Sequence, residues 1–364
     1  MPKITGIWVT AVLKKNFPFG LLAFLLIICV AFMAGCGQSK ERKSTPEITI
    51  TDSLGKNVTV PQPLEKMVIL NTDAAEVIAL LGAQGKVVGV SEPSITQKAF
   101  LGIKDKQTVG KWDTPSYEKI AELNPQAVIA FGKWPGEDLE KKLEPLNIKV
   151  IRLDCYKPET YDSDVKTLAR MVGEEKRAED FLKWREEKTK VLKERLNDAQ
   201  FEKVHVFAIS SSKLMKGDWG TFARGTATHQ GIEMAGGLNV AGDLSDYPKV
   251  SAEWVLSQNP AALVVCCYGK ELGYDAEDYA AAEKVKEQAL KNEILGKTDA
   301  IKHDRVYLLT NELLGGGKTA FGALYLAKWF YPDRFKDVNP EQVYREYFEK
   351  WLGAEYKGKH VYPL

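Results

Sequence analysis

The sequence repeats one fourteen-residue pattern, as Ser116-Tyr-Glu-Lys-Ile-Ala-Glu-Leu-Asn-Pro-Gln-Ala-Val-Ile129 and as Ser251-Ala-Glu-Trp-Val-Leu-Ser-Gln-Asn-Pro-Ala-Ala-Leu-Val264. Matching residues are 135 positions apart throughout, without an insertion. Each copy predicts a helix that begins after a Ser cap and ends before Asn-Pro, followed by an apolar strand. The spacing exceeds that of solenoid repeats, which is about 20 to 50 residues. The repeat therefore predicts two similar lobes with a cleft between them.

The segments around the repeat alternate between expected strands and expected helices. Such alternation predicts an α/β fold in which mostly parallel sheets are covered by helices. The expected elements are an antiparallel ribbon at 47–62, strands at 68–70, 87–90, 150–153, 204–209 and 306–309, and helices at 74–81, 141–146, 229–235 and 320–330.

The longest helical pattern lies between the lobes, from Tyr161 to Leu196, with Gly173 as a point of possible division. We expect an N-terminal lobe at 47–157, a linking helix at 158–200, and a C-terminal lobe with C-terminal helices at 201–364. Four aromatic residues fall on nearly one face of a further helix, 341–352. We expect this face to pack on the second lobe.

The N-terminus has the pattern of an export signal. Lysines at 3, 14 and 15 precede an apolar run, and the small residues Ala34-Gly35 lead into Cys36. This ending resembles the lipobox of bacterial lipoproteins, which implies a signal peptide at 1–35, lipid on Cys36 and a flexible tether at 36–46. The alternative is an uncleaved membrane anchor, because 17–34 is almost long enough to span a bilayer.

Charge and cysteine content exclude two further classes. Removal of residues 1–35 takes away three lysines and no acid, so the formal net charge changes from +1 to −2. A near-neutral chain lacks the basic surface that nucleic acid binding requires. Three cysteines then remain besides Cys36, at 155, 266 and 267. An odd number argues against a disulfide framework, and we expect Cys266 and Cys267 to be buried strand thiols.

Several motifs in fixed order carry a family resemblance. They are Cys36 with its tether, the Val-Val-Gly-Val strand at 87–90, the Trp112 segment, the long linking helix, and the two Glu-x(5)-Asn-Pro motifs of the repeat. Over about 47–335 the chain resembles the ABC-importer substrate-binding proteins for ferric siderophores, haem and cobalamin. The resemblance implies two Rossmann-like lobes joined by a helix, with ligand bound between them. It also implies an extracytoplasmic, membrane-anchored monomer that serves a permease dimer and its ATPase.

The repeated glutamates, Glu118 and Glu253, match family positions that contact arginines of the permease. Two equivalent carboxylates on similar lobes can address two equivalent basic sites on a symmetric partner. The alternative is that each acid only complements a helix dipole, a contribution of about 0.3 to 1 kcal/mol.

Loops that follow expected strands supply the ligand-facing candidates, because open α/β sheets bind ligands at the carboxyl ends of their strands. These loops combine aromatic and basic residues. A P-loop is excluded, because it would need Gly where Glu312 stands. We expect the Gly315–Lys318 run to be a close-approach turn, whose free N–H groups, together with Lys318, could meet an anionic ligand. The ligand-binding candidates are Trp112, Lys133, Trp134, Lys216, Trp219, Arg224, Tyr247, Tyr268 and Lys318.

Aromatic and basic groups together suit a large, π-rich and partly anionic chelate, such as a ferric siderophore, haem or a corrinoid. Bare metal is not expected, because the four histidines, at 205, 229, 303 and 360, are scattered. If the ligand is haem, His229 and Tyr268 are the axial candidates. No permanent cofactor is expected. An enzyme is not expected either, since no Gly-x-Ser-x-Gly or His-Glu-x-x-His motif occurs. A co-sensor lipoprotein is the remaining alternative.

Overall fold

The computed structural model describes residues 46–197 and 202–363, and residues 46–364 form one compact unit. The predicted signal peptide, Cys36 and nearly all of the predicted tether lie outside the described residues. Among the described residues, no helix combines the length and apolar character that crossing a membrane requires.

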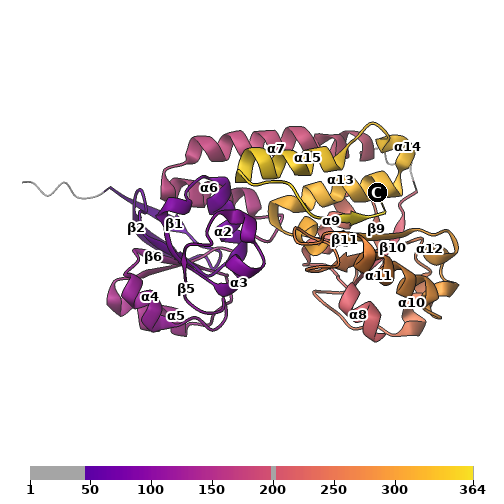
Figure 1. Cartoon of the computed structure of the whole chain (residues 1–364), viewed down its shortest axis with the longest axis horizontal. Helices are drawn as coiled ribbons and strands as arrows, with labels where there is room; N and C mark the ends of the chain where they lie inside the picture. Colours follow the sequence, from indigo (N-terminus) through magenta and orange to yellow (C-terminus); the bar gives the residue numbers. More distant parts are fainter. Residues whose placement is uncertain (1–45, 198–201, 364) are drawn as a thin grey trace, which may run out of the picture. The chain divides into compact units, whose positions relative to one another are not determined.

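The first lobe is built on a five-stranded parallel sheet in the order β5-β4-β3-β6-β7 (Figure 1). Three of its strands, β3, β6 and β7, are almost fully buried, as expected of a parallel sheet with helices on both faces. The strands are β3 (Met67–Ile69), β4 (Val87–Val90), β5 (Gln107–Thr108), β6 (Ala127–Ala130) and β7 (Lys149–Arg152). The predicted ribbon forms beside it, from β1 (Glu47–Thr51) and β2 (Asn57–Pro61).

The second lobe is built on a sheet in the order β12-β11-β10-β8-β9, parallel except for β12. Its strands are β8 (His205–Ser210), β9 (Leu238–Asn239), β10 (Ala262–Cys267), β11 (Val306–Thr310) and β12 (Val361–Tyr362). The order β9-β8-β10-β11 repeats the order β4-β3-β6-β7 of the first lobe. The two-lobed α/β fold predicted from the repeat is confirmed.

Both copies of the repeat fold alike. Helix α4 (Tyr117–Leu123) and helix α10 (Ala252–Gln258) each begin after a serine whose Oγ accepts a backbone N–H, from Lys119 and from Trp254. Each ends at an asparagine in the left-handed conformation, Asn124 with φ 45° and Asn259 with φ 39°. Asparagine tolerates this conformation, which turns the chain from the helix into the strand.

Gly173 divides the helical segment between the lobes. It ends helix α6 (Tyr161–Val172) at a φ of 78°, which favours glycine, and α7 (Glu175–Leu196) follows. Helix α6 packs on α2 (Thr72–Leu80) of the first lobe, whereas α7 packs on α13 (Thr319–Phe330) of the second. The connection is therefore a pair of helices rather than one rod.

The remaining helices cover the two sheets and the loops between them. In the first lobe they are α3 (Glu92–Thr96) and α5 (Asp138–Leu143). In the second they are α8 (Ser211–Lys216), α9 (Ala227–Met234), α11 (Ala280–Lys291), α12 (Asp299–Lys302), α14 (Pro332–Phe335) and α15 (Pro340–Glu346), with a π-helical segment, η7 (Tyr347–Leu352), after α15. Short 3-10 turns include η5 (Asn311–Leu314) and η6 (Gly316–Lys318).

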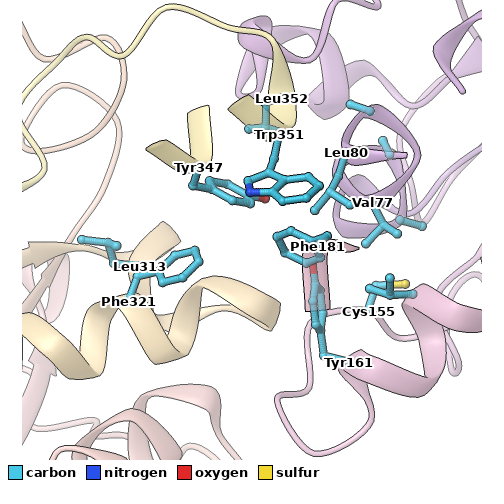
Figure 2. Packing of buried hydrophobic residues seen from close by; sticks show 14 of the residues in the cluster. Val77, Leu80, Cys155, Tyr161, Phe181, Leu313, Phe321, Tyr347, Trp351 and Leu352 are labelled. Atoms are coloured by element: carbon cyan, nitrogen blue, oxygen red, sulfur yellow. The ribbon is translucent and has the colours of Figure 1, made fainter. Parts of the chain in front are cut away.

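The core that joins the lobes is aromatic. Phe181 of α7 packs on Tyr347 and Trp351 of η7, and Tyr347 also packs on Phe321 of α13 (Figure 2). Segment η7 contacts α2 of the first lobe as well, where Val77 and Leu80 face the same cluster (Figure 2). The aromatic C-terminal segment was expected to pack on the second lobe; it packs on that lobe and also contacts the first.

Candidate functional site

A pocket with a volume of about 650 Å³ lies between the two lobes. It is placed where the strands of both sheets end, because its walls are the segments that follow β3, β7, β10 and β11. This is the position at which open α/β sheets bind ligands. Its lining includes Thr72, Asp73, Lys98, Tyr156, Phe222, Thr228, Tyr247, Tyr268, Tyr274, Asp275, Asn311, Glu312 and Lys318.

The wall from the first lobe is set by Asn71, directly after β3. Its side-chain oxygen accepts the N–H groups of Asp73 and Ala74, which caps α2, and its amide donates to the carbonyls of Leu153 and Asp154 after β7. The buried Asn71 thus fastens two strand ends together. These hydrogen bonds hold the segments that bring Thr72 and Tyr156 to the pocket.

The wall from the second lobe is aromatic and polar. Tyr268 follows β10 and donates its hydroxyl to Asn311 Oδ1 at 3.3 Å. Tyr247 packs edge-on against Phe222, with ring centroids 5.9 Å apart. Burial raises the pKa of both tyrosines, so their hydroxyls are neutral hydrogen-bonding groups at neutral pH.

Three buried charges lie at the base of the pocket: Lys98 and Lys318, which are part of its lining, and Glu76 directly behind them. Glu76 of α2 accepts hydrogen bonds from Lys318 Nζ, 2.6 Å from both carboxylate oxygens, and from Lys98 Nζ at 2.8 Å. Tyr347 donates its hydroxyl to the same carboxylate at 2.7 Å, and Lys98 also bonds Asp73 at 3.0 Å. Burial opposes ionisation of Glu76, but the two ammonium groups outweigh it and hold its pKa below the usual range. The ion pair of Glu76 with Lys318 joins the two lobes.

Glu312 extends this group of charges into the pocket. It follows β11, lines the pocket, and has a shielded Oε2 without a hydrogen-bond partner among the described residues. Burial raises its pKa, although Lys318 and Lys98 act in the opposite direction. Glu312 was not predicted as a site residue; in the sequence it serves only to exclude a P-loop.

The Gly315–Lys318 run packs closely between the lobes, and its polar groups are largely paired within the protein. Gly316 N–H is not free but donates to the Tyr156 carbonyl at 2.8 Å. A Cβ on Gly317 would lie 2.4 Å from the Tyr161 ring, so this glycine allows close contact between the lobes. Lys318 lines the pocket, yet it is 5% exposed and its charge is paired with Glu76. The predicted close-approach turn is confirmed, whereas the expected anion contact is corrected, because the Gly316 N–H and the Lys318 charge are already paired within the protein.

Two of the other eight ligand candidates line the pocket, Tyr247 and Tyr268. In the first lobe, Trp112, Lys133 and Trp134 lie outside it; Trp112 packs edge-on against Trp134 and against Phe131, which in turn contacts Tyr156. Ligand contact by this outer group stays a prediction.

In the second lobe, Lys216, Trp219 and Arg224 also lie outside the pocket. Trp219 packs partly on the core, and the guanidinium of Arg224 donates to the Gly242 carbonyl. Tyr156, Phe222 and Tyr274 line the pocket and were missed. Tyr156 could have been predicted by the criterion that selected the other candidates, because it lies in a loop shortly after β7.

Of the two axial candidates for haem, only Tyr268 lines the pocket. A ring nitrogen of His229 lies 3.1 Å from the side-chain amide of Asn239, outside the lining. Cys155, Cys266 and Cys267 are buried free thiols, and burial raises the pKa of each. The prediction that Cys266 and Cys267 are buried strand thiols is confirmed.

The repeated glutamates, Glu118 and Glu253, are both exposed and occupy the first turns of α4 and α10. Neither lines the pocket. In Figure 1 both helices lie along the lower edge of the view, whereas α7 and α15 run along the upper edge. Glu253 accepts hydrogen bonds from its own backbone N–H and from Ser251, which lower its pKa. Both carboxylates are thus accessible to a partner.

Comparison with known proteins identifies the family. Residues 67–313, which contain the repeat and most of the pocket, match the family described as periplasmic binding protein. The chain belongs to this family. By family and by its relatives, it is a substrate-binding protein of the kind that serves ABC importers, and those relatives are transport proteins rather than enzymes.

Similar proteins span nearly the whole chain. The molybdate-binding protein MolA of Haemophilus influenzae is 24% identical, with 85% of this chain and 92% of MolA covered. The uncharacterized ABC transporter substrate-binding lipoprotein YvrC of Bacillus subtilis is 26% identical, with coverage of 87% and 98%. The crystal structure of the TroA-like periplasmic binding protein FepB from Veillonella parvula superposes with a TM-score of 0.71 at 21% identity, with coverage of 86% and 99%. This last likeness bears on the fold.

Proposed function

We propose that this protein captures an iron chelate, a ferric siderophore in the first place, and delivers it to the permease of an ABC importer. The observation that carries the proposal is the pocket formed by strand ends of both lobes. Its volume of about 650 Å³ falls within the range of small-molecule sites, about 300 to 1,000 Å³. A bare ion would fill only a small part of it.

The aromatic lining supports a large ligand with flat or apolar parts. Tyr156 comes from the first lobe, and Tyr247, Tyr268 and Tyr274 come from the second. Tyrosine offers both a ring for stacking and a hydroxyl for hydrogen bonds. The alternatives within the same function are haem and a corrinoid, and Tyr268 is then the axial candidate for haem.

A binding experiment tests this ligand class. The purified protein is titrated with ferric siderophores, haemin and cyanocobalamin, and its melting temperature and absorption spectrum are recorded. A ligand present at about 100 times its Kd adds about 2.7 kcal/mol to the free energy of unfolding, so the melting temperature rises. No rise with any of these compounds contradicts the ligand class.

We further propose that Glu118 and Glu253 contact arginines of the permease dimer. Their support is their exposure at equivalent positions of the two lobes. Carboxylate and guanidinium form bidentate, charge-assisted hydrogen bonds, which fix the orientation of the two proteins as well as attracting them. The double variant Glu118→Arg with Glu253→Arg is expected to abolish uptake while the Kd for ligand stays unchanged.

The matched control replaces two other exposed glutamates, Glu122 of α4 and Glu283 of α11, by arginine. This control has the same change in net charge, so it separates docking from a general charge effect. Equal uptake by both double variants contradicts the docking role.

The proposal places the protein outside the cytoplasm as a monomer held to the membrane by lipid on Cys36. Mass spectrometry of the membrane-bound protein is expected to find an N-terminus at Cys36 that carries lipid, because removal of residues 1–35 and lipidation both act at this cysteine. Membrane-bound protein that keeps residues 1–35 would favour the alternative of an uncleaved anchor.

A further inference from the structure

The positive charges at the pocket are already paired with carboxylates of the protein. Lys98 and Lys318 are the cations in its lining. They are 8% and 5% exposed, and each is in an ion pair with a carboxylate, Lys98 with Asp73 and Glu76 and Lys318 with Glu76. An anionic ligand would have to compete with these buried carboxylates for the ammonium groups.

Acidic groups outnumber the cations. Asp73, Asp275 and Glu312 line the pocket, and Glu76 lies directly behind it. Asp275 is exposed at the pocket, and among the described residues neither Asp275 nor Glu312 is in an ion pair. Four acids against two lysines give a formal charge of −2, and −1 if Glu312 holds a proton.

The other bases lie outside the lining, including Lys357, whose Nζ lies 4.5 Å from the ring centroid of Tyr274. Lys133, Lys216 and Arg224 are exposed and none of them lines the pocket. The other polar groups of the lining are uncharged, among them Thr228 and Asn311. Hydroxyl and amide groups can bind neutral ligands, but they do not compensate a net negative charge.

We propose that the acidic floor, Asp73, Glu76 and Glu312, together with Asp275, makes the pocket selective for chelates that are neutral or positively charged and excludes anionic ones. The inference rests on the proposed function and narrows its ligand class. Ferric hydroxamates with a free ammonium group, or an uncharged corrinoid, meet the requirement. Tris-catecholates, haem with ionised propionates and oxyanions do not.

A set of three ferrioxamines tests the selectivity. Ferrioxamine B carries a terminal ammonium group, its N-acetyl derivative is neutral there, and its N-succinyl derivative ends in a carboxylate, while the iron-binding part is the same. The full chain is titrated with each by calorimetry, alongside cyanocobalamin, haemin and molybdate. A single charge several ångströms from the acids acts strongly in a partly buried site. The Kd of the N-succinyl compound is therefore expected to be at least about tenfold higher than that of the N-acetyl compound or of ferrioxamine B.

Two variants tie the selectivity to the pocket. Glu312→Gln and Asp275→Asn each remove one acid with little change of size. Each is expected to lower the ratio of the Kd of the N-succinyl compound to the Kd of ferrioxamine B by about threefold or more. Glu277→Gln, an exposed residue outside the pocket, is the matched control and leaves the ratio unchanged. Asp275 is exposed, so its variant remains informative if Glu312→Gln lowers stability.

The outcomes are distinct. An anionic member that binds as tightly as the neutral and cationic ones, or variants that leave the ratio as it is, overturns the charge selectivity and leaves the proposed function standing. If no chelate in the panel binds, the ligand class of the proposed function fails, and the inference falls with it.

Discussion

Replacing Lys318 by methionine should strongly destabilise the protein. Lys318 and Glu76 are each 5% exposed, and Lys318 Nζ lies 2.6 Å from both oxygens of the Glu76 carboxylate. Methionine keeps most of the volume of lysine but has no charge. Among the residues that the structure describes, Glu76 then keeps Lys98 and the Tyr347 hydroxyl as partners. A buried carboxylate that loses one of its two cations is poorly compensated.

The expected size follows from other buried ion pairs. Removal of one partner costs about 3 to 5 kcal/mol, chiefly because the other charge stays buried. With an m value of about 3 kcal/mol/M, the urea midpoint falls by about 1 to 1.7 M. Glu76→Gln should cost at least as much, because Lys98 and Lys318 both lose their shared carboxylate.

Urea unfolding followed by tryptophan fluorescence measures these changes. Lys302→Met is the matched control, because Lys302 forms an exposed ion pair with Asp299, and such pairs contribute about 0 to 1 kcal/mol. The double variant Lys318→Met with Glu76→Gln should be less destabilised than the sum of the single variants, since the two side chains interact directly. A loss below about 0.5 kcal/mol for Lys318→Met would refute the reasoning.

Two further predictions concern stability. Burial lowers the pKa of His360 from 6.5 to about 4, so the unfolded chain binds the proton more readily than the folded chain. The free energy of unfolding therefore falls as the pH drops from about 6.5 to 4, and the loss is about 2 kcal/mol at pH 5. Between pH 7 and pH 5, the melting temperature should fall less for His360→Gln than for the native chain, and as much as in the native chain for the exposed control His303→Gln. An equal fall in melting temperature for His360→Gln and the native chain would contradict this. Gly317→Ala should cost about 1 to 3 kcal/mol, because its Cβ would lie 2.4 Å from the Tyr161 ring, whereas Gly315→Ala, with its nearest atom 3.9 Å away, should be tolerated; similar urea midpoints for these two variants would count against the close contact.

Much of the fold could be predicted from the sequence because its signals are local. The Ser caps and Asn-Pro ends of the repeat place α4 and α10 within single residues, and Gly173 marks the division of the linking segment. Apolar runs likewise place the buried strands.

The site was harder to predict because its contacts are distant in sequence. Lys318 and Glu76 are 242 positions apart, and nothing near Lys318 shows that its charge is already paired. The position of Lys133 after a strand indicates the edge of the sheet, but not the direction in which the side chain points. The same limit explains why Tyr274, in a loop, was missed.

The most direct test of the account is ligand binding by two tyrosine variants from opposite walls of the pocket. Tyr156→Ala removes a ring from the first lobe and Tyr247→Ala removes one from the second, and both residues line the pocket. The ligand is the chelate that raises the melting temperature most in the panel, and calorimetry gives its Kd. The account predicts weaker binding in both variants, by about 1 kcal/mol or more, because each ring supplies stacking area. Native affinity in both variants would contradict a binding site between the lobes.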